Sequence, residues 1–167
     1  MISIRPLTPA DWPAVARIYE LGIASGNATF ETEVPGWGEW DAGKRPDCRL
    51  AATLEGQVVG WAALSPVSKR AVYAGVAENS IYIDPACQGQ GIGKRLLAAL
   101  VEASEAAGVW TLQTSIFPEN EASLHIHEVC GFRVVGRRER IAMHTGLWRD
   151  TILMERRAEP HPREVHK

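Results

Sequence analysis

A glycine-rich segment, residues 88–94 (QGQGIGK), constrains the fold of this chain more than any other stretch of its sequence. An apolar, β-branched run that ends at Ile83 precedes it, and a helical pattern starts within it at Ile92. Asp84-Pro85 ends the first run, because a residue before proline is biased away from helical geometry. The order of strand, glycine turn and helix predicts an α/β layout.

The glycines of this segment, Gly89, Gly91 and Gly93, allow backbone amides of the turn and of the first helical turn to approach one anion. Such a site suits a phosphate. Lys94 and Arg95 oppose the helix dipole at this end unless an anion compensates them. The alternative for the glycines is a plain tight turn without a ligand. The alternative for Lys94 and Arg95 is a pair of solvated surface charges.

Two common phosphate-binding motifs are excluded by their spacing. A Walker A loop places four residues between its first glycine and its Gly-Lys pair, whereas three separate Gly89 from Gly93, and Arg95 follows where Ser or Thr is needed. A dinucleotide fingerprint needs a glycine at position 94 and an acidic end to the next strand, and neither is present.

The remainder of the chain alternates strand and helix patterns without an internal repeat. Residues 26–38 mix turn formers with large side chains, and we expect a loop there. Helices are expected from Thr8, from Ile92 to a cap at Gly108, and over Glu121–Cys130 before Gly131. Strands are expected at Ile2–Arg5, Leu50–Leu54, Val58–Leu64, Asn79–Ile83, Trp110–Ile116, Phe132–Val135 and Trp148–Met154.

The composition fits one globular domain, with 46% hydrophobic and 23% charged residues in 167. We assign residues 1–156 to the domain and 157–167 to a charged flexible tail, with fraying expected after Met154. A net charge of -2 without basic runs gives no footprint for nucleic acid, and no segment suits a membrane span. The start of the chain lacks a signal-peptide layout, so we expect a cytoplasmic protein.

The three cysteines, Cys48, Cys87 and Cys130, are widely spaced and lack the spacing of a zinc site. We therefore expect neither a disulfide framework nor a metal, and we interpret the cysteines as small apolar residues. The tryptophans are interpreted as core or subunit-interface residues rather than as ligand stackers. These are Trp37, Trp40, Trp61, Trp110 and Trp148.

The glycine segment, as Gln88-x-x-Gly91-x-Gly93, resembles the pyrophosphate signature of the GNAT acetyltransferase superfamily. A wider set of motifs resembles its phosphinothricin N-acetyltransferase and methionine sulfoximine or sulfone acetyltransferase branch. The resemblance implies a single GNAT domain with a mixed, mostly antiparallel central sheet flanked by helices. The motifs are Glu78–Ile83, Asn27–Glu33 with Trp40, Asn120-x-x-Ser123, His127-Glu128-x-x-Gly131-Phe132 and Gly146-x-Trp148-x-Asp150.

The same resemblance implies acetyl-CoA as co-substrate, in a cleft where two strands diverge. It assigns the pyrophosphate to the amides of the glycine turn, and other parts of the cofactor to Asn120 and Ser123. The backbone of the strand before the turn holds the rest of the cofactor. The residues implied in the strand and turn are Ile81, Tyr82, Ile83, Gly89, Gln90, Gly91, Ile92, Gly93 and Lys94.

Acetyl transfer to an amine requires a neutral nitrogen, and deprotonating an ammonium at pH 7 costs about 1.4 to 4.6 kcal/mol. The resemblance assigns the general base to Glu78, for which an exposed structural acid is the alternative. The backbone N–H of Ile83 can stabilise the developing oxyanion. His127 or Tyr82 can protonate the leaving thiolate, and a purely structural histidine is the alternative for His127.

The acceptor is expected to be a small amino-acid analogue, such as phosphinothricin, methionine sulfoximine or methionine sulfone. It is acetylated by direct attack in a ternary complex. The resemblance places Arg70, Tyr73, Phe30 and Thr32 around it, with a guanidinium suited to a carboxylate. Acetylation of a protein N-terminus, a lysine or a polyamine, and a non-catalytic acetyl-CoA sensor, are the alternatives. The family resemblance and the tryptophans favour a homodimer.

Overall fold

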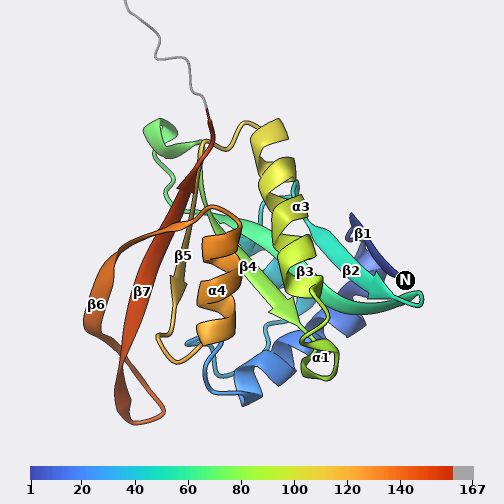
Figure 1. Ribbon diagram of the computed structural model, residues 1–167, viewed down its shortest axis with the longest axis horizontal. Helices are drawn as coiled ribbons and strands as arrows, with labels where there is room; N and C mark the ends of the chain where they lie inside the picture. Colours follow the sequence, from blue (N-terminus) through green and yellow to red (C-terminus); the bar gives the residue numbers. More distant parts are fainter. Residues whose placement is uncertain (160–167) are drawn as a thin grey trace, which may run out of the picture.

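A 7-stranded sheet runs through the computed structural model, which describes residues 1–159. The strand order is β1-β2-β3-β4-β5-β7-β6 (Figure 1). Within the described range β4 and β5 pair in parallel, and the other neighbours pair antiparallel. The predicted mixed, mostly antiparallel sheet is confirmed. The strands are β1 (Ile2–Pro6), β2 (Leu50–Leu54), β3 (Gln57–Pro66), β4 (Val76–Ile83), β5 (Thr111–Ile116), β6 (Arg133–His144) and β7 (Leu147–Arg157).

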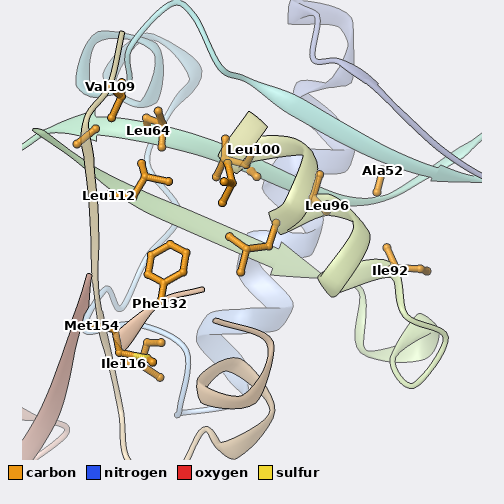
Figure 2. Close-up of a cluster of buried hydrophobic side chains, with 14 of the residues drawn as sticks. Ala52, Leu64, Ile92, Leu96, Leu100, Val109, Leu112, Ile116, Phe132 and Met154 are labelled. Carbon is orange, nitrogen blue, oxygen red and sulfur yellow. The ribbon is translucent and has the colours of Figure 1, made fainter. Parts of the chain in front are cut away.

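Helices α3 (Ile92–Ala106) and α4 (Glu121–Val129) cover one face of the sheet (Figure 1). The periodic apolar positions of α3 form the centre of the main core, where Leu96, Leu97 and Leu100 are all fully buried. Burying each such side chain contributes about 1.5–3 kcal/mol. Figure 2 shows Leu96 and Leu100 in the same cluster as Leu64, Leu112, Ile116, Phe132 and Met154. The helix predicted here is confirmed, and Gly108 follows it with a left-handed φ of 84°.

An aromatic layer covers the opposite face, beneath α1 (Trp12–Ala24) and α2 (Trp37–Gly43). A short 3-10 turn (Pro9–Asp11) precedes α1, so the helix start predicted at Thr8 is confirmed. The loop predicted through Gly38 is wrong at its end, because α2 begins at Trp37. The short helix contains two glycines, which disfavour helix formation. Tertiary contacts stabilise it, since Trp37 and Trp40, which stack on each other at 5.7 Å, both contact Trp12 of α1 at 5.6 Å.

The last two strands are longer than predicted. β6 extends nine residues beyond Val135, through a polar, arginine-rich stretch that lacks a strand pattern in the sequence. Its register shifts twice against β7, and Asp150 bonds to Arg137 and to the backbone N–H of Arg140 across the pair. β7 continues to Arg157, which pairs with Thr111, so the fraying expected from Glu155 is wrong for its first three residues.

The remaining expectations about the chain have mixed outcomes. The three cysteines are free and lie partly buried against the main core, as small apolar residues do. Trp148 is 59% exposed, so it is not a core residue. Among residues 1–159, no helix has both the length and the apolar character needed to cross a membrane. Most of the tail predicted at 157–167 lies outside the described residues.

Asp11 provides a test of how the first strand and first helix are joined. Arg5 donates to both oxygens of Asp11 at 2.8 Å, and this contact lowers the pKa of Asp11 to about 2. A lowered pKa stabilises the fold above the usual value of 3.8, and the stabilisation is lost as the pH falls through about 2. We expect Asp11→Asn to lower the free energy of unfolding by about 1–2 kcal/mol at pH 7, measured by urea denaturation.

The difference between Asp11→Asn and the wild type should shrink by about pH 2.5, where the native carboxylate is also losing its charge. Asp47→Asn is the matched control, since Asp47 makes a similar two-contact pair with Arg45 in a surface segment where its side chain is 44% exposed. Equal losses for the two variants would contradict this account.

Candidate active site

The site begins where β4 and β5 stop pairing. Their parallel register covers Val76, Ala77 and Glu78 of β4, and β4 then continues to Ile83 while the two strands diverge (Figure 1). The N–H of Asp84, just after β4, donates to the carbonyl oxygen of Val59 at 2.8 Å, so the backbone of Asp84 points towards β3. Because successive backbone groups of a strand point to opposite sides, the N–H and C=O groups of Ile81 and Ile83 point towards the diverging β5.

Side chains of β4 alternate in the same way between two layers of the molecule. Ile81 and Ile83 pack on the main core beneath α3 and α4. Tyr82 packs in the aromatic layer beneath α1, and Glu78 and Ser80 point to that same face by alternation. One strand therefore supplies both faces of the opening between β4 and β5.

A cleft of about 380 Å³ lies on the α3 side of this opening. The glycine turn forms one wall, with left-handed φ angles of 80° at Gly89 and 77° at Gly91. Gly91 caps α3 without a side-chain hydrogen bond, and the first turn of the helix contains no acidic residue. The first amides of α3 are thus available to an anion. The wall also includes Ile81, Ile83, Cys87, Gly93 and Lys94.

The opposite wall of this cleft is the start of α4. Asn120 and Ser123, both predicted as cofactor contacts, line it. Asn120 also caps the helix, since its Oδ1 accepts from the N–H of Ser123 at 3.2 Å. Its Nδ2 donates to the carbonyl oxygen of Asn27 at 3.1 Å. The Asn120 side chain therefore also ties α4 to the loop between α1 and α2.

A second cavity of about 280 Å³ lies on the α1 side and adjoins the first at Ile81 and Ser123. Glu78 projects into it from β4, and Phe30 and Glu31 project from the loop between α1 and α2. The Phe30 ring lies edge-on to Phe117 at 4.8 Å. Further lining comes from Thr29, Ser80, Tyr82, Thr114 and Thr151. The two cavities have room for a long ligand and a small polar one in contact.

Comparisons with known proteins agree with this arrangement. The model of the acetyltransferase (GNAT) family matches residues 12–132. The chain belongs to this family. A phosphinothricin N-acetyltransferase of Alcaligenes faecalis is 32% identical over 92% of this chain and 81% of its own length. An L-methionine sulfoximine/L-methionine sulfone acetyltransferase of Pseudomonas aeruginosa is 28% identical over 95% of each chain.

A solved structure of a GNAT superfamily phosphinothricin acetyltransferase from Sinorhizobium meliloti, in complex with AcCoA, superposes with a TM-score of 0.84. Its sequence is 30% identical, and the match covers 93% of this chain and 88% of that one. The resemblance inferred from the sequence motifs is confirmed.

His127 lies deep in this GNAT site, with only 1% of its surface exposed. Its Nδ1 is 2.7 Å from the carbonyl oxygen of Ser123, which can only accept, so Nδ1 carries the proton. Its Nε2 then accepts from Nδ2 of Asn79 at 3.0 Å. Burial lowers the pKa of His127, which favours the neutral ring. His127 also lines the cavity that contains Glu78, and its role as an acid stays a prediction.

Tyr82 is the other residue predicted as a possible acid. Its ring stacks between Trp61 at 4.8 Å and Tyr19 at 4.9 Å, and its side chain also lines the second cavity. Gly22 of α1 makes this packing possible, because a Cβ there would lie 2.7 Å from the Tyr82 ring. Burial raises the pKa of Tyr82 well above the usual phenol value. Tyr82 can donate a hydrogen bond, but full proton transfer from it is unfavourable.

The predicted acceptor residues are only partly brought together. Phe30 lines the second cavity, whereas Thr32 lines shallower hollows on the other side of its loop. Arg70 and Tyr73 lie in the loop between β3 and β4, where the guanidinium stacks over the Tyr73 ring at 5.7 Å. Neither residue lines the two cavities described above. The loop leaves the sheet at Pro66 and Ala77, while the cavities lie beyond Glu78 on β4.

Lys44 was missed by the sequence analysis, since it follows α2 without any motif. Its Nζ donates to Ser65 at 3.1 Å and to Ser80 at 3.4 Å, on the face of the sheet that carries Glu78. Desolvation lowers the pKa of Lys44, and the nearby charges of Glu78 and Glu31 partly offset this. The ammonium group of Lys44 thus lies close enough to Glu78 and Glu31, which line the second cavity, to interact with their charges.

Gly91 allows a test of the glycine turn that needs no ligand. A Cβ added there would meet open space, so the cost of Gly91→Ala comes from its left-handed φ of 77° alone. We expect a loss of about 1–2 kcal/mol in the free energy of unfolding, measured by chemical denaturation. Gly36→Ala is the control, because Gly36 is equally open and has a φ of -70°. A similar cost at both positions would show that the turn is not strained.

Proposed function

We propose that this chain transfers the acetyl group of acetyl-CoA to the amino group of a small amino-acid-like acceptor, by direct attack in a ternary complex. The acceptor is of the phosphinothricin, methionine sulfoximine or methionine sulfone type. The observation that carries the proposal is the contact between two cavities at Ile81 and Ser123. One lies at the start of α3, where no side chain bonds to the first amides, and the other contains Glu78. The names of the relatives support the choice of acceptor.

The donor side of the proposal uses backbone groups. The amides of the glycine turn and of the start of α3 receive the pyrophosphate of acetyl-CoA. The groups of Ile81 and Ile83 that point into the opening hold the arm that carries the thioester. The N–H of Ile83 then donates to the thioester oxygen as negative charge develops on it. One well-placed donor of this kind lowers the barrier by about 2.7–4 kcal/mol.

The acceptor side depends on charge. Glu78 and Glu31 line the cavity, so it attracts the ammonium form of an amino-acid acceptor. Glu78 is solvent-exposed and lies next to the opening, where it removes a proton from the ammonium directly or through water. The neutral nitrogen attacks the thioester carbon, the carbon–sulfur bond breaks, and the second proton that the nitrogen loses passes through solvent to the departing thiolate, which leaves as CoA. The hydroxyl of Tyr82 hydrogen-bonds the departing sulfur.

The proposal is tested by measuring CoA release against a panel of acceptors that includes phosphinothricin, methionine sulfoximine, methionine sulfone and spermidine. We expect turnover with at least one of the amino-acid analogues. Glu78→Gln should lower kcat by about 100-fold or more, because positioned general bases typically contribute factors of this size. It should also remove the acidic limb of the pH profile, while acetyl-CoA still raises the Tm of the variant.

Glu33→Gln is the matched control, since Glu33 lies on the same loop but lines an outer hollow. An unchanged kcat and pH profile in Glu78→Gln would remove Glu78 from the role of base. Turnover of spermidine alone would replace the proposed acceptor class. Background CoA release with every acceptor, together with a Tm raised by acetyl-CoA, would favour the sensor alternative.

We also propose that the chain forms a homodimer through the pair β6 and β7. β6 is one of the two edge strands of the described sheet, and both β6 and β7 carry exposed apolar side chains. Met143 and Trp148 are cross-strand partners in this group, and they are 55% and 59% exposed. Exposed apolar side chains along a sheet edge are typical of an association surface, and here they lie at both ends of the β6–β7 pair. The group is Val134, Val135, Ile141, Met143, Leu147 and Trp148.

Met143→Glu tests this surface by placing a charge beside Trp148. We expect the wild-type chain to sediment as a dimer and the variant as a monomer, because burying an unpaired carboxylate is unfavourable. Val72→Glu is the control, since Val72 is 66% exposed in the loop between β3 and β4. A dimer that survives Met143→Glu would exclude this surface.

A further inference from the structure

The loop between α1 and α2 carries acceptor-site residues but contains no helix or strand over residues 27–36. Residues 28–31 of this loop line the acceptor cavity, opposite Glu78. Backbone hydrogen bonds fix the ends of the segment, from Gly26 to Ile23 and from Trp40 to Gly36. The position of its middle therefore depends on side-chain contacts.

Arg149 of β7 supplies the most extensive of these contacts. Its side chain is 14% exposed. Nη1 donates to the carbonyl oxygen of Gly26 at 2.9 Å, and Nη2 donates to Oδ1 of Asn27 at 2.8 Å. One guanidinium thus holds the backbone and the side chain of two successive loop residues. A planar fork with five donors can do this, whereas a lysine ammonium cannot present the same geometry.

The same guanidinium also contacts side chains outside the loop. Its Cζ lies 3.9 Å from the centre of the Phe117 ring, and Nη2 is 3.3 Å from Oε2 of Glu119. Nη1 also lies 3.2 Å from Nδ1 of His144 on β6. Because Arg149 is always protonated, this contact requires Nδ1 of His144 to accept. Arg149 is therefore anchored on β6 and on the segment between β5 and α4.

Phe30 shows how the anchoring reaches the acceptor cavity. Its ring lies edge-on to Phe117 at 4.8 Å and to His144 at 5.9 Å, and both of these rings flank Arg149. The carbonyl oxygen of Asn27 accepts from Asn120, which caps α4. The loop thus closes on a single cluster that joins β6, β7 and the start of α4.

We propose that Arg149 is a positioning residue for the acceptor site. It holds residues 26–31 so that Phe30 and Glu31 face Glu78, and it does not itself line the acceptor cavity. This inference rests on the proposed function for its kinetic consequence only. Loss of Arg149 weakens acceptor binding, because the loop must then be ordered by the acceptor itself. Binding of acetyl-CoA, which lies on the other side of β4, is retained.

The first test uses hydrogen exchange on the full chain without any substrate. In Arg149→Met we expect the hydrogen-bonded amides within residues 26–31, those of Gly26, Asn27 and Glu31, to exchange at least about tenfold faster than in the wild type, while the amides of α3 keep their protection. Arg137→Met is the matched control, since Arg137 makes a two-contact pair with Asp150 on the same strand pair but does not reach the loop. The control should leave residues 26–31 unchanged.

The second test separates the two substrates. Arg149→Met should raise the acceptor KM by about tenfold or more and leave the acetyl-CoA KM within about twofold. Arg149→Lys, which keeps the charge but loses the fork, should rescue less than half of the loss in kcat/KM. Asn27→Ala removes one acceptor of the guanidinium from the loop side, and it should change exchange and acceptor KM in the same direction by smaller factors.

The proposal is overturned if residues 26–31 exchange at the wild-type rate in Arg149→Met, or if α3 loses protection equally. Equal increases in both KM values would also overturn it, since they indicate general destabilisation. If Arg149→Met fails to fold, Asn27→Ala carries both measurements. If the wild type turns over no acceptor, the proposed function fails, and the exchange rates alone decide the role of Arg149.

Discussion

The end of pairing between β4 and β5 is the constraint on which the rest of the structure depends. After Glu78 the backbone groups of β4 that point towards β5 lose their partner strand, although buried N–H and C=O groups need partners. α4 fills part of the gap between the strands, since Nε2 of its His127 accepts from the side-chain Nδ2 of Asn79 at the first position beyond the paired region. Oδ1 of Asn79 remains buried without a partner in the described structure. The fold thus keeps the strands apart and leaves polar groups for a ligand.

The two sides of the opening meet different electrostatic requirements. On the α3 side, a helix start without a capping side chain or an acid in its first turn suits a negatively charged group. On the α1 side, Glu78 and Glu31 suit a positively charged one, and Lys44 lies behind them as a counter-charge. The proposed function uses this difference, with the anionic donor in one cavity and the cationic amine in the other, and the two cavities touch at Ile81 and Ser123.

Local patterns predicted the parts of this molecule that depend on local chemistry. The glycine turn, the period of α3 and the hairpin of β2 and β3 follow from neighbouring residues, and the structure has all three. α2 and the extension of β6 depend on contacts with distant residues, such as Trp37 on Trp12 and Arg137 on Asp150, so their own sequences do not reveal them. Arg149 and Lys44 were missed for the same reason, since each acts on residues remote in the sequence.

The family resemblance assigned Glu78 to the role of base and Phe30 to the acceptor site, and the structure has both residues in the lining of one cavity. The same reasoning could not place Arg70 and Tyr73, because a loop can leave the sheet in several directions after Pro66. It also could not settle His127, whose role depends on which ring nitrogen carries the proton. That is decided by a helix carbonyl and by Asn79, and neither contact is visible in the motif.

The alternation along β4 has a consequence for how such an enzyme changes over evolutionary time. The side chains of Glu78, Ser80 and Tyr82 line only the second cavity, Ile83 lines only the cleft beneath α3, and Ile81 lines both. Under the proposed function, substitutions at Glu78, Ser80 or Tyr82 alter the choice of amine while Ile83 and the glycine turn, which handle the acyl donor, are inherited unchanged. A single strand of this kind lets a lineage diversify its substrates without rebuilding its chemistry.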